Sequence, residues 1–278
     1  MRTLSLCLLG ILIMSPVSAT EIVAHRGASH DAPENTLASI NLAWKQHSDA
    51  VEIDIQLTSD GNIVAMHDKT PKRTAGGKDT PLSEHTLAEL KALDAGSWKG
   101  KQFAGERIPK LAEILETIPA GKRLFIEIKT EAEILPELKR VLDTAGRPAR
   151  ETPLICFSYE TMRAAKELLP DLKMYWLVKL ERDKQTGQPN YTAEQLIEKV
   201  RAAKLDGVDL GAAPPLDEKF VQTFRQAGLE VYVWTVNDIE QARGYQNLGV
   251  DGITTDRPAL MLEKLNQSGR PKAESGGN

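Results

Sequence analysis

The sequence contains very little cysteine, with only Cys7 and Cys156 among its 278 residues. Cys7 lies in an N-terminal segment that we expect to be removed, so a single cysteine remains and an intramolecular disulfide is excluded. Cys156 follows apolar neighbours, where we expect it to serve as a buried small hydrophobic residue. The fold must therefore depend on its core, and the chain is long enough for one large domain with a substantial core.

An excess of charge of either sign is also absent. Lysine and arginine total 35 and the acidic residues total 39, which gives a formal net charge of -4. A balance of this kind does not predict binding to nucleic acid or to an anionic membrane. The sequence also lacks a GxSxG motif, a P-loop and a glycine-rich dinucleotide fingerprint. Serine hydrolase and nucleotidase functions therefore have no supporting motif.

Long hydrophobic runs are missing except near the N-terminus. A weakly positive start is followed by an apolar run over 4–14 and by the small residues Val17-Ser18-Ala19. This pattern is typical of a secretory signal peptide, residues 1–19, and the run is too short to cross a bilayer. A buried or anchoring N-terminal helix is the alternative. We therefore expect a periplasmic or secreted protein with no stable membrane anchor, and the signal peptide does not distinguish the two locations.

The rest of the chain alternates short β-type runs with helical stretches. The expected strands are 22–25, 51–57, 63–67, 124–128, 154–157, 174–178, 207–210, 230–236 and 252–255, and the expected helices are 36–46, 111–117, 134–144, 161–169, 193–203, 218–227, 239–248 and 258–265. Such alternation predicts a parallel sheet covered by helices. The domain is expected to span 20–265, with an insertion at 69–106 and a disordered polar tail at 266–278.

Nine extended runs are one too many for an eight-stranded barrel. Only a few turn-type residues separate the second run from the third, so we expect these two to form a hairpin. In the expected register, Thr58 pairs with Ile63 and Asp54 pairs with His67. Without the return run, eight parallel strands remain, which predicts an α/β fold of the (β/α)8 TIM barrel type with a small insertion after the second strand. An open doubly wound sheet is the alternative, without a fingerprint to support it.

Charged residues occur at every second position on two of the expected strands. Glu52 and Asp54 share one face of the second strand, and Glu127 and Lys129 repeat the spacing on a later one. Their isoleucine neighbours suit the helix-facing side, so the charges are expected to face the barrel interior. Buried carboxylates are strongly unfavourable there without a cation or another partner. An all-oxygen ligand set suits Ca²⁺ or Mg²⁺, and also Mn²⁺, better than Zn²⁺.

All five histidines lie within the first 85 residues, and two of them end expected extended runs. These are His25 and His67, at the end of the barrel where active sites are built. Their side chains would suit general acid and base catalysis. Arg26 and Lys129 add positive charge that would bind a phosphate beside a metal ion.

These residues stand in motifs that resemble those of the glycerophosphodiester phosphodiesterase family. The motifs occur in the family's order and span about residues 22–262: His25-Arg26-Gly27, Pro33-Glu34-Asn35-Thr36, Val51-Glu52-Ile53-Asp54, Met66-His67-Asp68, Ile126-Glu127-Ile128-Lys129, Val233-Trp234-Thr235-Val236-Asn237 and 251–258. Each motif alone would be weak, but the ordered set is specific. The insertion at 69–106 also agrees with the family pattern.

The resemblance implies a role for each candidate site residue. The implied catalytic acid and base are His25 and His67, the metal ligands are Glu52, Asp54 and Glu127, the phosphate-binding residues are Arg26 and Lys129, the site-organising residues are Glu34 and Asn35, and the aromatic wall is Trp234. Two alternatives stay open from the residues themselves. Glu34 and Asn35 could instead cap the helix that starts near Thr36, and Trp234 could be a core residue.

The implied reaction is hydrolysis of a small-molecule glycerophosphodiester, such as glycerophosphocholine or glycerophosphoethanolamine. It would use one divalent cation, Ca²⁺ or Mg²⁺, and release sn-glycerol 3-phosphate and an alcohol, through attack of the glycerol 2-hydroxyl and a cyclic phosphate. A phosphodiesterase for lysophospholipids or phosphoinositides on the same barrel is one alternative. A catalytically dead periplasmic binding protein is another. The preferred alcohol, the native metal and the oligomeric state are not determined by the sequence.

Overall fold

A computed structural model describes residues 20–182, 185–187, 189–212 and 216–266. The predicted signal peptide at 1–19 lies outside these residues, as does the predicted disordered tail apart from Asn266, which ends the last helix. None of the helices in the described ranges is both long and apolar enough to cross a membrane.

Nine strands and ten α-helices are assigned within the described residues. The strands are β1 (Glu21–Ala24), β2 (Ala50–Leu57), β3 (Ile63–Ala65), β4 (Arg123–Ile128), β5 (Leu154–Cys156), β6 (Met174–Val178), β7 (Gly207–Gly211), β8 (Glu230–Trp234) and β9 (Gly252–Thr255). The helices are α1 (Leu37–Lys45), α2 (Lys72–Ala75), α3 (Leu87–Ala92), α4 (Leu111–Leu115), α5 (Leu135–Ala145), α6 (Tyr159–Leu168), α7 (Ala193–Ala202), α8 (Glu218–Gln226), α9 (Ile239–Leu248) and α10 (Pro258–Asn266).

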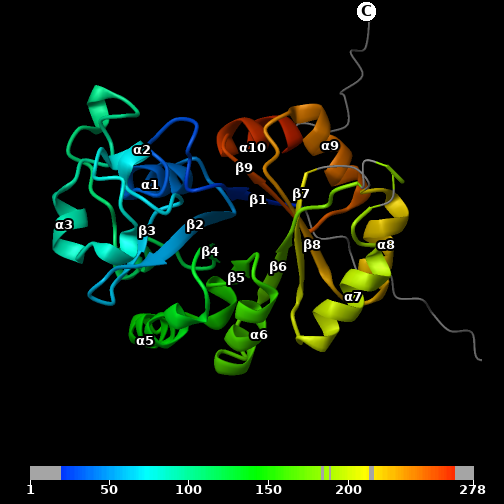
Figure 1. Ribbon diagram of the computed structural model, residues 1–278. Coiled ribbons are helices and arrows are strands. Elements are labelled where there is room, and N and C mark those ends of the chain that lie inside the picture. The colour runs from blue at the N-terminus through cyan, green and yellow to red at the C-terminus, as the bar shows by residue number, and fades with distance from the viewer. Residues whose placement is uncertain (1–19, 183–184, 188, 213–215, 267–278) are drawn as a thin grey trace, which may run out of the picture.

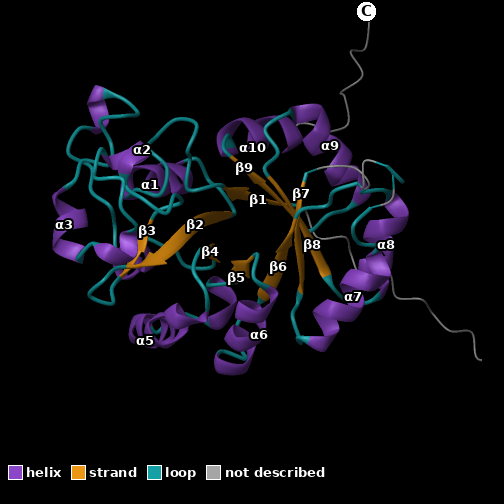
Figure 2. Cartoon of the chain, in the orientation of Figure 1, coloured by secondary structure: helices purple, strands orange, loops and turns teal. Residues whose placement is uncertain are grey.

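Eight of the strands close into a parallel barrel. The order is β1-β9-β8-β7-β6-β5-β4-β2, and the β1–β2 pairing closes the ring. Helices surround the strands, with α5 and α6 beside β4 to β6 and α7 to α10 beside β6 to β9 (Figures 1 and 2). The predicted (β/α)8 TIM barrel is therefore confirmed.

The surplus run forms a hairpin with β2, as predicted, but in a different register. Strand β3 pairs antiparallel with β2, and Ile63 lies opposite Leu57 instead of Thr58. The loop differs from the expected one because Thr58 donates its N–H to Asn62 O (2.9 Å) while Gly61 adopts a left-handed φ of 75°. The predicted pairing of Asp54 with His67 is therefore wrong, since Asp54 O accepts a bond from the backbone of Met66 at 3.0 Å.

The segment predicted as an insertion, 69–106, packs beside this hairpin. It contains α2 and α3, and Figure 1 shows both as part of a lobe next to β3. Helix α3 begins with a capping box between Thr86 and Glu89. Leu82 and Leu90 join Val64 and Met66 of the hairpin in a small hydrophobic cluster separate from the main core. The hairpin thus anchors the insertion to the edge of the barrel.

Successive side chains of each strand point alternately into the barrel interior and toward the layer under the helices. Ile155 belongs to the interior cluster, whereas its neighbour Cys156 belongs to the helix-facing core. Burial raises the pKa of the Cys156 thiol to about 12, and its predicted role as a buried small side chain is confirmed. Across the middle of the interior, the rings of Phe125, Tyr175 and Tyr232 pack together at centroid distances of 4.7 to 5.8 Å. This aromatic layer separates the two mouths of the barrel.

Candidate active site

Three carboxylates converge at the carboxyl-terminal mouth of the barrel. Glu52 and Asp54 come from β2, and Glu127 of β4 lies opposite Asp54 in the strand register. One carboxylate oxygen from each lies within 4.8 Å of the other two, and all three side chains are buried. Glu52 Oε1 and Asp54 Oδ1 have no hydrogen-bond partner among the described residues. Converging buried oxygens that lack donors fit a hard divalent cation.

The electrostatics of the three carboxylates supports this interpretation. Burial and the neighbouring charge of Asp54 raise the pKa of Glu52 well above its usual value, and they raise the pKa of Glu127 to about 7. Burial also opposes ionisation of Asp54, but the charges of Arg26 and Lys129 hold its pKa below the usual value. The three carboxylates therefore resist being ionised together even beside two basic residues, and a bound divalent cation would favour the ionised form of all three.

The two basic residues lie directly on this cluster. Lys129 Nζ is 2.7 Å from Glu127 Oε1 and 3.4 Å from Asp54 Oδ1. Arg26 Nε is 3.2 Å from Asp54 Oδ2, and the backbone N–H of Arg26 donates to Glu52 Oε2 at 2.9 Å. Arg26 has a left-handed φ of 56°, so the chain turns sharply as it leaves β1. That turn brings its backbone and its side chain to the same cluster.

Asn35 and Glu34 contact the same cluster and do not cap the following helix. Asn35 donates from Nδ2 to Asp54 Oδ2 (2.8 Å) and accepts the Asp54 N–H on its Oδ1 (3.1 Å). Glu34 Oε1 accepts a bond from Arg26 Nη1 at 2.9 Å. The N-cap of α1 is Thr36, in a capping box with Ser39. The helix-cap alternative for Glu34 and Asn35 is therefore wrong.

Each of the two histidines is paired with an aspartate through Nδ1. His25 Nδ1 lies 2.7 Å from Asp256 Oδ1, just past the last strand, and His67 Nδ1 lies 2.8 Å from Asp68 Oδ1. Burial opposes ionisation of Asp256, but the hydrogen bond and charge of His25 bring its pKa below the usual value. An aspartate on Nδ1 fixes the tautomer and orientation of the ring. In both histidines Nε2 remains as the nitrogen available for proton transfer.

A chain of ion pairs joins the second histidine pair to the cluster of three carboxylates. Arg73, at the start of the insertion, donates to both oxygens of Asp68 at 2.6 and 2.9 Å. The same guanidinium donates to both oxygens of Glu34, which in turn binds Arg26. The hydrogen bond from Arg73 lowers the pKa of Asp68, so the carboxylate that pairs with His67 stays ionised. The insertion therefore contributes directly to the geometry of the site.

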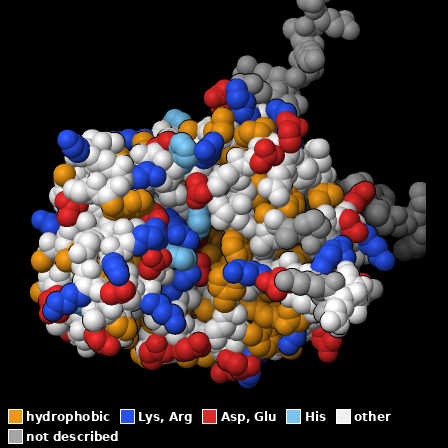
Figure 3. Space-filling model, turned by 45° about the horizontal axis from the view of Figure 1, so that its top comes forward, with side chains coloured by type: hydrophobic (Ala, Val, Ile, Leu, Met, Phe, Trp, Pro, Cys, Tyr) orange, Lys and Arg blue, Asp and Glu red, His pale blue; other side chains and the backbone are white. Residues whose placement is uncertain are grey.

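These side chains surround a cavity of about 210 Å³. His25, Arg26, Glu52, His67, Glu127 and Lys129 form one wall, and Trp234, Phe157, Leu177 and Asp209 lie on the other. Trp234 is half-buried and meets Phe157 edge-on at 5.5 Å, so it is part of the cavity wall and not only of the core. Figure 3 shows histidine and basic side chains gathered beside an apolar area at a hollow in the surface.

All ten residues singled out in the sequence lie at or directly behind this cavity, but four further residues were missed: Asp68, Arg73, Asp209 and Asp256. Asp68 and Asp256 are in the quoted motifs, and their positions just past strand ends were a usable signal. Asp209 is a charge inside an apolar strand, which is the same signal that identified Glu52. Arg73 leaves no such pattern, because its role depends on how the insertion folds back.

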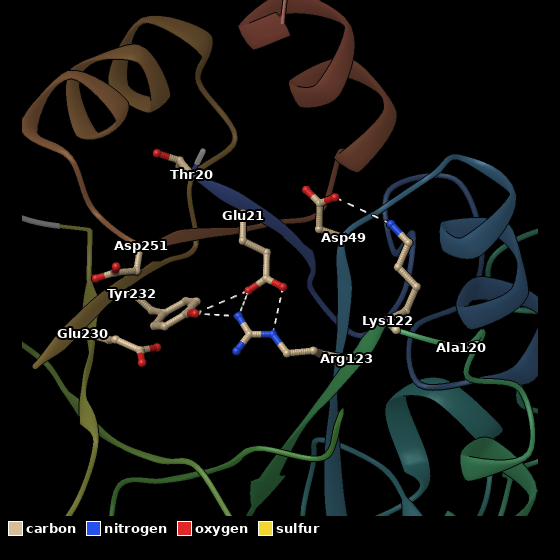
Figure 4. A pocket seen from close by; sticks show the side chains of 10 residues that line it. Thr20, Glu21, Asp49, Ala120, Lys122, Arg123, Glu230, Tyr232 and Asp251 are labelled. Carbon is tan, nitrogen blue, oxygen red and sulfur yellow. Dashed lines mark hydrogen bonds and ion pairs between the residues drawn. The ribbon is translucent and has the colours of Figure 1, made fainter. Parts of the chain in front are cut away.

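A larger cavity of about 670 Å³ lies at the opposite, amino-terminal mouth of the barrel. Figure 4 shows Arg123 bound to Glu21 and Tyr232, and Lys122 facing Asp49 at 3.5 Å. These charges already have partners, and no histidine lines the cavity among the described residues. Charges paired at this end of a barrel are typical of a stabilising role.

Comparison with known proteins agrees with this geometry. Residues 25–260 match the model of the glycerophosphoryl diester phosphodiesterase family. The glycerophosphodiester phosphodiesterase of Caldanaerobacter subterraneus subsp. tengcongensis is 33% identical over 258 residues, which cover 90% of this chain and 99% of that protein. The Bacillus subtilis glycerophosphodiester phosphodiesterase is 31% identical over 288 residues, which cover 92% and 94%.

A solved structure of similar fold carries a ligand. It is a phosphodiesterase of Oleispira antarctica in complex with the product sn-glycerol-3-phosphate. That chain is 32% identical to this one with a TM-score of 0.79, and the match covers 89% of this chain and 97% of the other.

Proposed function

The chain belongs to the glycerophosphoryl diester phosphodiesterase family and is a glycerophosphodiester phosphodiesterase, and we propose that it releases sn-glycerol 3-phosphate and an alcohol with the help of one divalent cation. The observation that carries the proposal is the meeting of three buried carboxylates and two histidine–aspartate pairs around one cavity. The product bound to the Oleispira antarctica phosphodiesterase supports the same outcome here.

Glu52, Asp54 and Glu127 would hold the cation, which we propose to be Ca²⁺ or Mg²⁺ because all three ligands are carboxylates. When bound, it would stabilise charge on the phosphate and lower the pKa of a glycerol hydroxyl. Arg26 and Lys129 would bind the phosphate oxygens from the same wall. Asn35 would keep Asp54 oriented through its two hydrogen bonds.

His25 and His67 would transfer the protons. One Nε2 accepts the proton of the glycerol 2-hydroxyl, whose oxygen attacks phosphorus, and the other donates a proton to the departing alcohol. The cyclic phosphate that forms is then opened by water, with the two histidines exchanging roles. Asp256 and Asp68 hold each ring with Nδ1 occupied, so each Nε2 stays free to exchange protons. A diester without the 2-hydroxyl should accordingly be cleaved very slowly; rapid cleavage would contradict attack by that hydroxyl.

The chain is proposed to be exported, either to the periplasm or out of the cell. The N-terminal pattern at 1–19 supports this location and lies outside the described residues. Sequencing the N-terminus of protein recovered from the periplasm or the medium should give Thr20 as the first residue. Recovery of only the uncleaved chain from the cytoplasm would contradict export.

The decisive experiment measures glycerol 3-phosphate release from glycerophosphocholine with Ca²⁺, Mg²⁺ or EDTA. Release should require a cation and should fall about 100- to 10,000-fold in His25→Ala, the range for loss of a general acid or base. His30→Ala is the matched control, because His30 also pairs through Nδ1 with an aspartate but is exposed and outside the cavity. If the folded, metal-loaded protein releases nothing from several head groups, lysophospholipid or phosphoinositide cleavage or a pure binding role would replace this proposal.

A further inference from the structure

One buried carboxylate in the cavity has no role in the chemistry described so far. Asp209 lies in the middle of β7 and is only 2% exposed, yet it lines the active-site cavity. Its Oδ1 has no hydrogen-bond partner within the described part of the chain. Burying an unpaired carboxyl group is unfavourable, and an apolar residue of similar size would avoid that cost. A group that binds to it in the cavity would account for its presence.

The surroundings of Asp209 leave open space on the cavity side. The same face of β7 carries only glycine before and after it, Gly207 and Gly211, so Asp209 is the one β7 side chain that points into the barrel. A side chain at Gly211 would have ordinary room, with the nearest atoms 3.7 Å away on Lys179 and Trp234. The Trp234 indole donates to the backbone carbonyl of Asp209 at 3.2 Å and does not use its carboxyl group. The carboxyl oxygens thus remain available.

Asp209 is not part of the metal cluster. The three converging carboxylates come from β2 and β4, whereas Asp209 comes from β7 on the facing wall, where its strand neighbours are Leu177 and Tyr232. Arg26 and Lys129 are instead paired with Asp54. Phosphate bound at the basic wall would therefore leave Asp209 facing an arm of the diester.

We propose that Asp209 is a specificity-determining residue that accepts a hydrogen bond from the terminal hydroxyl of the glyceryl arm, the hydroxyl farthest from phosphorus. This rests on the proposed function, in which the 2-hydroxyl is used for attack and the terminal hydroxyl is free. A carboxyl oxygen accepts such a bond whether or not the group is protonated.

Two observations favour the glyceryl arm over the alcohol arm. Asp209 is enclosed, and the cavity of about 210 Å³ is below the about 300 Å³ at which pockets for drug-sized ligands begin, so the arm held there is small. Phe157 on the same wall is 41% exposed, and Lys129 and Lys179 lie 6.0 and 5.8 Å from its ring. This open edge gives the variable alcohol arm a route out of the cavity, past the Phe157 ring.

The test compares two substrates that both keep the 2-hydroxyl. One is glycerophosphocholine, and the other is its 2-hydroxypropyl analogue, which lacks only the terminal hydroxyl. Wild type should prefer the first by about 10- to 100-fold in kcat/KM, as expected for one hydrogen bond to a charged or strongly polar group. In Asp209→Leu the preference should nearly vanish because glycerophosphocholine is cleaved more slowly while the analogue is cleaved as in wild type. An unchanged preference in that variant would overturn the proposal.

Two further measurements distinguish hydroxyl recognition by Asp209 from metal binding and from misfolding of the variant. Cation affinity by calorimetry should be the same in wild type and Asp209→Asn; a large loss would make Asp209 a metal ligand and overturn the proposal. Wild type should also bind glycerol 3-phosphate more tightly than propane-1,2-diol 1-phosphate. This comparison uses wild-type protein only, so it does not depend on whether a variant folds. Equal binding of the two phosphates would contradict only the proposed role of Asp209. Absence of glycerol 3-phosphate release from every diester would instead contradict the proposed function.

Discussion

At the scale of single residues, the site is organised by carboxylates with different partners. Glu52 and Glu127 are buried beside the charge of Asp54, and their pKa values are raised. Asp68 and Asp256 each accept from a histidine and from other donors, and their pKa values are lowered. The raised pKa values of Glu52 and Glu127 suit ligands that ionise when a cation binds. The lowered pKa values of Asp68 and Asp256 suit carboxylates that stay ionised and orient a histidine ring.

Replacing Asp256 with asparagine should lower kcat about 100- to 10,000-fold, since the His25 ring would lose the acceptor that fixes its tautomer. KM and cation affinity should change little, because Asp256 is neither a cavity-lining residue nor one of the three converging carboxylates. Steady-state kinetics and calorimetry measure these quantities. A variant with normal kcat would show that the His25–Asp256 pair is not used in proton transfer.

The same variant makes a prediction about stability against pH. The pKa of Asp256 is lower in the folded protein than in the unfolded chain, so its contribution to folding is present above about pH 4 and is lost as the pH falls further. The melting temperature of Asp256→Asn should therefore be below that of wild type at pH 6, and the gap should narrow toward about pH 3. A difference in melting temperature that grows as the pH falls would contradict a stabilising contribution of ionised Asp256.

At the scale of elements, the hairpin and the insertion complete a site that the barrel alone leaves unfinished. Strand β3 returns the chain so that His67 reaches the cavity, and α2 supplies Arg73. Arg73 binds Asp68 and Glu34 together, so it connects the His67–Asp68 pair to Arg26 beside the three buried carboxylates. Loop segments of barrels commonly carry such functions.

Arg73→Met should keep the aliphatic stem but remove both ion pairs, which would loosen His67 and Arg26 together. We expect kcat/KM to fall about 10-fold, with cation affinity unchanged. Lys72→Met in the same helix is the control, because Lys72 forms an exposed pair with Asp79, away from the cavity. Equal effects of the two substitutions would mean that α2 acts through general stability and not through Arg73.

At the scale of the whole molecule, the two mouths of the barrel differ in how their buried charged side chains are paired. At the amino-terminal mouth Arg123 binds Glu21 and Tyr232 beneath the aromatic layer. At the carboxyl-terminal mouth Arg26 and Lys129 contact the acidic cluster, but the pKa values of Glu52 and Glu127 remain raised. The protein should therefore depend on a cation for part of its stability only at the second mouth.

Adding Ca²⁺ or Mg²⁺ to EDTA-treated protein should raise its melting temperature, measured by calorimetry. Glu52→Gln should remove this rise and should leave the metal-free protein as stable as wild type or more stable, because the unfavourable burial of an ionisable carboxyl group is gone. Glu230→Gln, at the other mouth, should keep the full response to the cation. The metal assignment fails if Glu52→Gln still responds to the cation as wild type does.

Much of the fold and most of the candidate site could be predicted from local sequence. Alternation with a period of two placed Glu52, Asp54 and Glu127 on inward faces, and the alternation of strands and helices led to the barrel. The hairpin register was wrong because the loop closes around a left-handed Gly61, and backbone conformation is not visible in a turn-type composition.

The amino-acid sequence by itself determined which residues alternate between the interior and the helices, since that depends only on strand periodicity. Only the tertiary structure decided which of them meet. Asp256 reaches His25 from 231 positions away because β9 pairs with β1 when the barrel closes. Arg73 reaches Glu34 because the insertion folds back over the hairpin. Asp209 lines the same cavity as Glu52 and Glu127 because opposite strands of a closed barrel share one narrow interior, a proximity that no local pattern encodes.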